Sequence, residues 1–246
     1  NIIPSIFLPT THGTASEVTM WGTIWNIEEK KKYSISHRNL YPKIAILDGN
    51  LTLSLPIDIS ITTIMDALSH SFEAIWNKNS NQKSTGYSIS AICSILQNID
   101  AFKNNTSNII IRNKLLYAST IAGLAFSNTT TAAAHSISYP LTMHFGIPHG
   151  IASSITLVPL LSINESSIKD SLNIICDKLN TDINGLKKII ENIPNNIINY
   201  KLSGWGISKS DISLLARESF TKGRMDNNIV DLSETDVMEI LKELYI

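Results

Sequence analysis

The hydrophobic pattern changes near residues 53–57, and this change limits the possible folds more than any other feature. Before it, the stretches SIFLPT at 5–10, VTMWGTIWNI at 18–27 and KIAILD at 43–48 are short and apolar, and the second is rich in β-branched and aromatic residues, as is typical of strands. After it, apolar residues recur with the spacing of a helix, and Gly and Pro separate the segments. The sequence therefore predicts a small β-containing part followed by a large all-α part.

Pro56 and Asp58 mark the start of the helical part. The charged stretch from Glu28 to Lys32 is expected to form a hairpin turn between the second and third predicted strands. Three short strands form only a small sheet beside a large helical part. We therefore expect residues 1–53 to be the C-terminal end of a larger α/β unit. The predicted helices, joined by short loops into a compact bundle, span 58–77, 84–98, 108–126, 129–139, 149–162, 167–179, 185–193, 195–202, 208–220 and 233–244.

Charge and cysteine content exclude several classes of protein. Lys plus Arg number 20 against 21 for Asp plus Glu, so there is no basic field of the kind that attracts nucleic acid. We find neither an apolar run of the ~20 residues that a membrane span needs nor a secretory signal. Cys93 and Cys176 lie far apart in apolar helical patterns, which indicates buried thiols in a reducing compartment. A cytoplasmic protein without nucleic-acid or membrane partners is expected.

The stretch MDALSHSFEA at 65–74 places Asp66 and His70 four residues apart. On a helix they share one face, one turn apart, so a carboxylate oxygen and an imidazole nitrogen can converge on one metal ion. Glu73 falls near the same face and could accept the free N–H of a ligating histidine. A local helical pair without any metal is the alternative for Asp66 and His70.

The stretch HSISYPLTMHFGIPHG at 135–150 adds His135, His144 and His149. Taken alone, His135 could be a helix-end or core residue, and His149 could belong to a turn or helix start. Together, one carboxylate and three imidazoles in apolar helical surroundings are costly to bury unless a cation pairs with them. Asp66, His70, His135 and His149 therefore form a candidate site for a divalent metal such as Fe²⁺ or Zn²⁺.

A third stretch, PTTHGTASEVT at 9–19, is rich in hydroxyl groups and small residues. Such a loop can offer backbone N–H groups and hydroxyls to a phosphate or to a nicotinamide amide. A Thr/Ser-rich turn between strands is an equally good interpretation, because the stretch is neither a GxGxxG fingerprint nor a P-loop.

Side by side, these three stretches resemble the iron-containing (group III) alcohol dehydrogenase family. The matching motifs are TTHGTASE at 10–17, DALSH with Glu73, AGLAFSN at 122–128, and His135 with His149 fourteen residues later. The resemblance implies a dehydroquinate synthase-like architecture, in which residues 1–55 are the C-terminal portion of an α/β dinucleotide-binding domain and residues 56–246 a helical metal-binding catalytic domain. It also implies that Asp66, His70, His135 and His149 ligate the metal, and that Thr10, Thr11, Gly13, Thr14 and Ser16 bind NAD or NADP.

Two departures from the family pattern modify these expectations. The glycine-rich pyrophosphate motif expected upstream of the Thr-rich loop does not occur in this sequence, which favours a fragment that lacks most of the dinucleotide domain. Where many relatives carry another histidine, this chain has Tyr139, which is expected to line the pocket or relay a proton, although it is a weaker acid–base group near neutral pH.

The resemblance implies a metal-dependent NAD(P)-linked alcohol dehydrogenase or aldehyde reductase that acts on a small aldehyde or alcohol, with a homodimer as a possible assembly. The wording around Tyr139 is similar to the phosphonate-metabolism branch, which suggests reduction of phosphonoacetaldehyde to 2-hydroxyethylphosphonate. Lys222 and Arg224 in FTKGRMDNN are the candidate residues for the phosphonate, with a solvated loop as the alternative. A generic short-chain alcohol or diol dehydrogenase, a non-redox metal-dependent relative and an inactive metal-binding module remain open.

Overall fold

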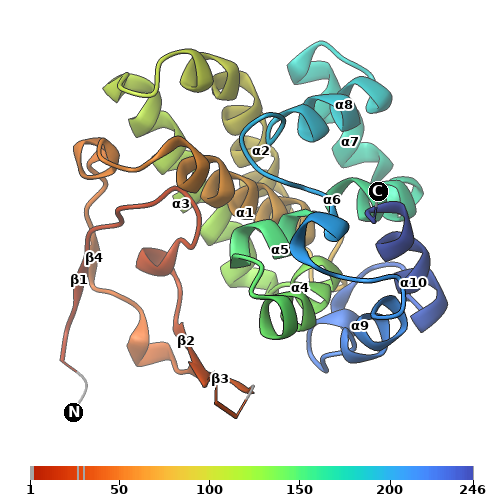
Figure 1. Cartoon of the computed structure of the whole chain (residues 1–246). Coiled ribbons are helices and arrows are strands. Elements are labelled where there is room, and N and C mark those ends of the chain that lie inside the picture. The colour runs from red at the N-terminus through yellow and green to blue at the C-terminus, as the bar shows by residue number, and fades with distance from the viewer. Residues whose placement is uncertain (1–2, 27, 30, 246) are drawn as a thin grey trace.

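The computed structural model describes residues 3–26, 28–29 and 31–245 of the chain. The strands and their connections lie on one side of a large helical body (Figure 1). Within this part of the chain, the helices are α1 Ile57–Ile75, α2 Gln82–Asn104, α3 Ile109–Thr129, α4 Ala133–Phe145, α5 His149–Ser154, α6 Leu157–Asn164, α7 Lys169–Leu179, α8 Ile183–Asn192, α9 Ile212–Glu218 and α10 Glu234–Glu243. The predicted fold class, a small β part followed by a large all-α part, is confirmed.

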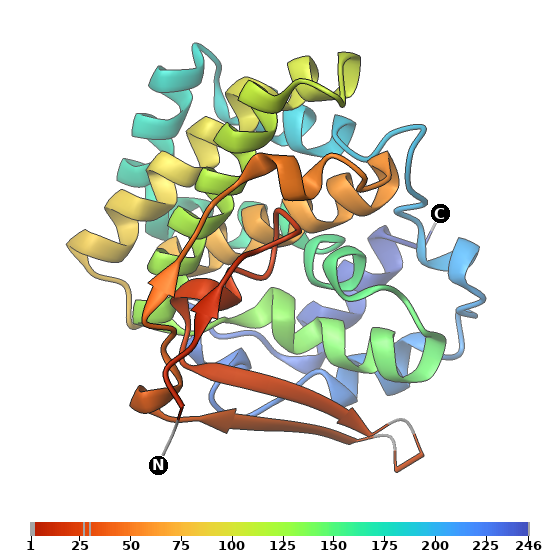
Figure 2. The same cartoon turned by 90° about the vertical axis from the view of Figure 1, so that its left-hand side faces the viewer.

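The strands form two small sheets. β1 (Ile6–Phe7) pairs in parallel with β4 (Ile44–Ala45), and β2 (Trp21–Asn26) pairs antiparallel with β3 (Lys31–Ser36). The hairpin formed by β2 and β3 extends along the edge of the helical body below α4 (Figure 2). The expected pairing of the second strand with KIAILD is therefore wrong: KIAILD pairs with SIFLPT instead. Ile27 and Lys30, in or beside the predicted turn, lie outside the described residues.

Helix α1 is the centre of the helical body, because α2, α3 and α5 all pack against it. Its apolar residues are fully buried, as at Ile61, Leu68 and Phe72, and its small polar residues find internal partners. The Ser69 hydroxyl, for example, donates to the carbonyl of Ser153 in α5 at 2.6 Å. A buried helix of this kind can carry polar side chains out of contact with water, provided that each has a hydrogen-bond or charged partner.

A glycine sets the distance between α1 and α5. A Cβ atom on Gly150 would lie 2.5 Å from the carbonyl oxygen of Thr62, closer than any side chain can approach. The missing side chain therefore lets the start of α5, including His149, approach the face of α1 that carries Asp66.

Two helix predictions are wrong. The predicted helix 195–202 is a turn, because Asn196 adopts a left-handed φ of 64° after Pro194. The helix predicted to end at residue 139 instead runs through Pro140 to Phe145. Ile137 and Leu141, on either side of the proline, are both fully buried, so packing outweighs the hydrogen bond that the proline removes.

Two helical stretches of the described chain, Ile109–Thr129 and His149–Leu179, are long and apolar enough to cross a membrane by length and composition. In the fold, 61% and 67% of their most apolar windows are buried inside the protein, respectively. The second stretch is also divided into α5, α6, a 3₁₀ turn and α7. Core helices pass the same test, so these stretches are weak evidence of a membrane span. Cys93 and Cys176 are free and buried, as expected.

Candidate metal centre

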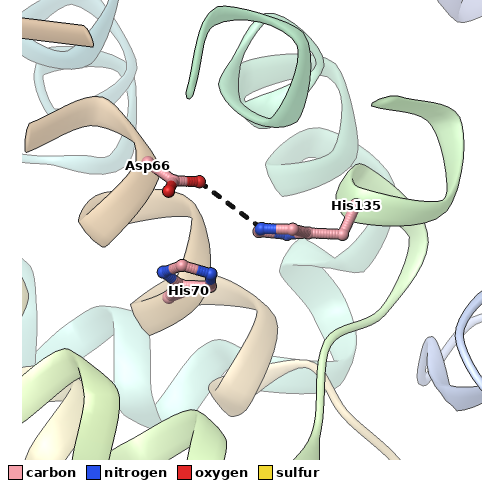
Figure 3. Close-up of side chains that lie close together, drawn as sticks. All are labelled: Asp66, His70 and His135. Carbon is pink, nitrogen blue, oxygen red and sulfur yellow. Dashed lines mark ion pairs between the residues drawn. The ribbon is translucent and has the colours of Figure 1, made fainter. Parts of the chain in front are cut away.

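Helices α1 and α4 bring together three of the four predicted metal ligands. Asp66 and His70 project from adjacent turns of α1 toward His135 on α4 (Figure 3). One potential ligand atom from each of the three lies within 4.8 Å of the others, and all three side chains are buried. The Asp66 Oδ1 and His135 Nε2 atoms are 3.4 Å apart. The spacing of four residues thus places both α1 groups on one face, as expected.

The fourth predicted ligand, His149, is the first residue of α5. Its ring meets that of His135 edge-on, with the centroids 5.3 Å apart. It also lines the same cavity as Asp66, His70 and His135. Three helices therefore bring one carboxylate and three imidazoles to the same cavity.

Buried partners orient two of these groups. The Glu73 carboxylate accepts hydrogen bonds from the backbone N–H groups of Ala132 and His135, both at 3.0 Å, and its other oxygen pairs with His135 Nδ1. Glu73 thus caps the start of α4 and directs the Nε2 atom of His135 toward Asp66, the supporting role expected of it. On the opposite side, the Ser153 hydroxyl donates to Asp66 Oδ1 at 2.7 Å.

The electrostatics of the cluster favour an ionised carboxylate and a neutral His70. Burial alone raises the pKa of Asp66, but His70, His135 and His149 together lower it well below its usual range. Burial and the neighbouring His135 lower the pKa of His70 to about 4. Burial opposes protonation of His135 as well, yet the charges of Glu73 and Asp66 raise its pKa.

The donor set fits a divalent transition metal. The buried Nδ1 atom of His70 has no hydrogen-bond partner among the described residues, which is unusual for a polar atom removed from water. The ring of His70 stacks on Phe126 with centroids 4.0 Å apart, so its orientation is fixed. Mixed imidazole and carboxylate ligation suits Fe²⁺ and Zn²⁺ better than Ca²⁺ or Mg²⁺.

The cluster faces a cavity of about 610 Å³ between the hairpin and the helices. One wall comes from β2 and β3, including Thr23, Ser34 and Ser36, and the opposite wall from α1, α4 and the Thr129–Thr131 turn. This volume is in the range of sites for small ligands. Asp66 is the one carboxylate among the described residues that line it.

The Thr-rich loop contributes two of its five predicted residues to this cavity. Thr14 and Ser16 line it, whereas Thr10, Thr11 and Gly13 do not. Gly13 has a packing role, because a Cβ atom there would lie 2.7 Å from the carbonyl oxygen of Thr63 on α1.

Two other contacts fix the loop on the helical body. The Thr120 hydroxyl on α3 donates to the buried carboxylate of Glu17 at 2.6 Å, and the backbone N–H of His12 donates to Thr63 Oγ1 at 3.4 Å. These contacts hold the loop against α1 and α3, beside the cavity that contains the candidate metal cluster.

The remaining candidates lie at the rim. Lys222 and Arg224 line the metal cavity. Tyr139 does not: it lines a neighbouring cavity, and its ring lies under the Arg224 guanidinium, 5.1 Å from the centroid. Burial raises the pKa of Tyr139, which makes it a poor proton relay near neutral pH. His144 is exposed on α4 and forms an ion pair with Glu218 at 2.5 Å.

Sequence reasoning missed several residues that shape the site. Ser153 lies four residues after His149, on the same face of α5, and this spacing could have indicated a partner for the cluster. Thr130 and Thr131 line the cavity from the turn before α4, and a run of three threonines before an apolar helix was the available signal. The hydroxyl groups of β3 gave none, because β3 itself was not predicted.

Residues 60–245 match the sequence pattern of the Fe-containing alcohol dehydrogenase family, C-terminal part, and residues 1–49 match that of iron-containing alcohol dehydrogenase. The matched residues include all four members of the metal cluster and the Thr-rich loop. The chain belongs to the iron-containing alcohol dehydrogenase family.

Three relatives illustrate the range of similarity. The chain is 29% identical over 253 residues to 1,3-propanediol dehydrogenase of Citrobacter freundii, covering 98% of this chain and 65% of that protein. It is 32% identical over 161 residues to phosphonoacetaldehyde reductase of Streptomyces viridochromogenes, covering 65% of this chain and 41% of that protein. The crystal structure of sulfoacetaldehyde reductase from Bifidobacterium kashiwanohense in complex with NAD⁺ superimposes with a TM-score of 0.91 at 30% identity, covering 99% of this chain and 65% of that one. The chain thus spans just under two thirds of the length of the propanediol dehydrogenase and of the sulfoacetaldehyde reductase, and its match to the phosphonoacetaldehyde reductase covers 41% of that protein.

Proposed function

We propose that the protein is a metal-dependent, NAD(P)-linked alcohol dehydrogenase or aldehyde reductase. The observation that carries this proposal is the convergence of Asp66, His70, His135 and His149 on one cavity that the Thr-rich loop also lines. The three named relatives are dehydrogenases or reductases of small alcohols and aldehydes, and family membership extends this activity to the present chain as a proposal.

The four ligands define the chemistry that the site can support. A divalent metal bound here, which we propose to be Fe²⁺ with Zn²⁺ as the alternative, would supply a Lewis acid that polarises a carbonyl oxygen. Glu73 and Ser153 hold His135 and Asp66 in place, so that little reorganisation is needed during the reaction. The ring of Phe126 stacks on one face of His70 and holds its orientation.

The nicotinamide cofactor is proposed to lie against Thr14 and Ser16, whose side chains are exposed at the cavity wall. Bound there, it would supply the hydride that passes to the aldehyde carbon. The related sulfoacetaldehyde reductase was crystallised with NAD⁺, which supports NAD as the cofactor, with NADP as the alternative.

Two substrates follow from the relatives. Phosphonoacetaldehyde, with 2-hydroxyethylphosphonate as product, is supported by the reductase of Streptomyces viridochromogenes. A short-chain diol or its aldehyde is supported equally by the propanediol dehydrogenase. A cytoplasmic location and a homodimer stay predictions; light scattering on the purified protein would measure the second.

The proposed function is tested by substitution of His149. With Fe²⁺ or Zn²⁺, NAD(P)H and an aldehyde, His149→Ala is expected to lower turnover at least about 100-fold, because the site loses a ligand. His144→Ala is the matched control, because His144 lies in the same stretch of sequence but pairs with the exposed Glu218. Near-normal turnover is expected for this variant. Equal activity of both variants would reject the proposed metal site.

A further inference from the structure

Two cations stand at the rim of the metal cavity. Lys222 and Arg224 flank Gly223, whose φ of +78° turns the chain sharply between them, and all three residues line the cavity that contains the metal cluster. Among the described residues, neither Lys222 nor Arg224 forms an ion pair with a carboxylate. Unpaired cations at the mouth of a binding cavity attract anionic ligands.

The Arg224 side chain is held in place, unlike an ordinary surface arginine. It donates a hydrogen bond from Nη1 to Thr131 Oγ1 at 2.6 Å, and the guanidinium lies over the ring of Tyr139, 5.1 Å from the centroid. Both contacts use neutral groups, so they fix the guanidinium without cancelling its charge. Within the described part of the chain, the other N–H groups of the guanidinium form no hydrogen bond, so they can donate to a ligand with several oxygen atoms.

The turn that carries Thr131 is itself rigid and strained. Thr130 has φ 62° and ψ −175°, a conformation that residues other than glycine rarely adopt and that concentrates at functional sites. The Asn227 amide stabilises this turn by donating to Thr130 Oγ1 at 2.9 Å and to the Thr131 carbonyl at 3.0 Å. The backbone N–H of Lys78, just after α1, donates to the Asn227 carbonyl at 2.7 Å. Arg224 is therefore fixed relative to the metal ligands on α1.

The charges across the cavity match an anionic substrate. A divalent metal would balance the carboxylates of Asp66 and Glu73. The Asp226 carboxylate accepts from the Gly223 backbone at 2.6 Å but does not line the cavity, so Lys222 and Arg224 leave the cavity lining positively charged. Glu218 lines the neighbouring cavity with Arg224, but it is paired with His144 at 2.5 Å. The negative charge of a tetrahedral phosphonate or sulfonate would complement this positive charge.

We propose that Arg224, positioned by Tyr139 and Thr131, binds a phosphonate or sulfonate head group of the substrate while its aldehyde faces the metal cluster. This inference rests on the proposed function and narrows its substrate class to short aldehydes with a tetrahedral anionic end. Lys222 adds charge from the exposed side of the rim. Tyr139 acts as a positioning residue: its ring supports the guanidinium, and its hydroxyl takes no part in proton transfer.

The first test compares four aldehydes: phosphonoacetaldehyde, sulfoacetaldehyde, 3-hydroxypropanal and propanal. The metal-loaded protein is expected to prefer one or both anionic aldehydes in kcat/KM by about 10-fold or more. Arg224→Met is expected to raise KM for the anionic aldehydes about 10- to 100-fold, the effect of losing hydrogen bonds to a charged group. Its kcat/KM for propanal should stay within about 3-fold. Arg217→Met, which removes an exposed cation from α9, is the matched control.

The second test separates positioning from structural support. Tyr139→Leu is expected to raise KM for the anionic aldehyde about 3- to 10-fold without a matching change in kcat, the size of a cation–π contact. Tyr139→Phe keeps the ring and should restore the wild-type KM. A third measurement needs no turnover: titration calorimetry with ethylphosphonate and with ethanesulfonate should give weaker binding to Arg224→Met than to wild type and Arg217→Met.

The outcomes distinguish this inference from the proposed function. A preference for propanal or 3-hydroxypropanal in the wild-type protein, or equal losses on all substrates in Arg224→Met, would overturn the anion site and leave the dehydrogenase intact. Absence of turnover on every aldehyde, together with Arg224-dependent ethylphosphonate binding, would reject the dehydrogenase and retain the anion site. A Tyr139→Phe variant as impaired as Tyr139→Leu would show that the hydroxyl matters and would reject the positioning role.

Discussion

The β-containing part and the helical part of this molecule use their apolar residues in opposite ways. Ile6 and Ile44, in the paired strands β1 and β4, are 56% and 51% exposed. In the helical part, residues of the same type, such as Ile61 and Ile95, are completely buried. Strands of two residues cannot cover an apolar face, whereas α1 is enclosed by other helices.

The β-containing part is fixed to the helices by a small apolar cluster, in which Ala15 and Trp21 pack against Phe126, and by individual polar contacts. The Thr120 hydroxyl donates to Glu17, the Asn113 side chain accepts from the Gly49 backbone at 2.8 Å, and Arg112 donates to the Thr52 carbonyl. A small apolar cluster and a few hydrogen bonds thus anchor the β-containing part, whereas a large buried core stabilises the helical part. The two parts should therefore respond differently to substitution.

The largest expected effect comes from matched isoleucine substitutions in the two parts. Ile95→Ala removes a fully buried side chain from α2 and is expected to lower the free energy of unfolding by about 2–5 kcal/mol. Ile44→Ala truncates a half-exposed side chain in β4, so a loss below about 1 kcal/mol is expected. Urea unfolding followed by circular dichroism measures both. Equal losses would show that the β-containing part has a core that we have not recognised.

A second effect concerns His12, the most deeply buried polar residue of the Thr-rich loop. Burial, assisted by the positive charge of Arg112, lowers its pKa from 6.5 to about 4. Between about pH 6.5 and 4, His12 is therefore protonated in the unfolded chain but not in the folded chain. The free energy of unfolding has its full value above about pH 6.5 and falls as the pH drops toward 4. Over this window His12 accounts for a loss of about 3 kcal/mol.

The His12→Leu variant isolates this contribution from that of the other titrating groups. Urea unfolding at pH 7.5, 6, 5 and 4 should give a shallower loss of stability for the variant than for the wild type. Parallel curves for the two proteins would mean that His12 is hydrated or partnered in solution, and that the loop is less firmly seated on α1 than its contacts indicate.

The smallest expected effect is on metal affinity. Glu73→Gln keeps an oxygen for the backbone N–H groups of Ala132 and His135 but removes the charge beside His135 Nδ1. A loss of metal affinity of about 10- to 100-fold is expected, as for other groups that support a ligating histidine. Competition with a chelator measures it, and Glu239→Gln, in an exposed ion pair with Lys242, serves as control. An unchanged affinity would mean that α4 alone orients His135.

The helical part was largely predictable from the sequence because its chemistry is encoded over short distances. A spacing of four residues placed Asp66 and His70 on one face of α1, and Glu73 followed on the same helix. Gly and Pro marked most helix ends. Pro140 was misleading because burial of Ile137 and Leu141 overrode a local helix-breaking signal.

The strand pairing and the rim were less predictable. The parallel pairing of β1 with β4 joins segments far apart in the sequence, which no local pattern specifies. β2 and β3 are joined by a short turn close to the predicted one, but the second strand of that hairpin was not recognised. Tyr139 lies one turn from His135 on α4, yet its ring meets Arg224 from a distant loop and lies beside a different cavity. Thr10 and Thr11 share a motif with Thr14, but the turn of the loop points only part of that motif at the cavity.

The glycine at the start of α5 also sets a dimension of the metal centre. Because a Cβ atom on Gly150 would lie 2.5 Å from the Thr62 carbonyl oxygen, only glycine lets α5 approach α1 this closely. Asp66 and His70 lie on α1 itself, whereas the distance of His149 from them depends on this contact between α1 and α5. Of the four proposed ligands, His149 is therefore the one that a larger residue at position 150 would displace most from α1.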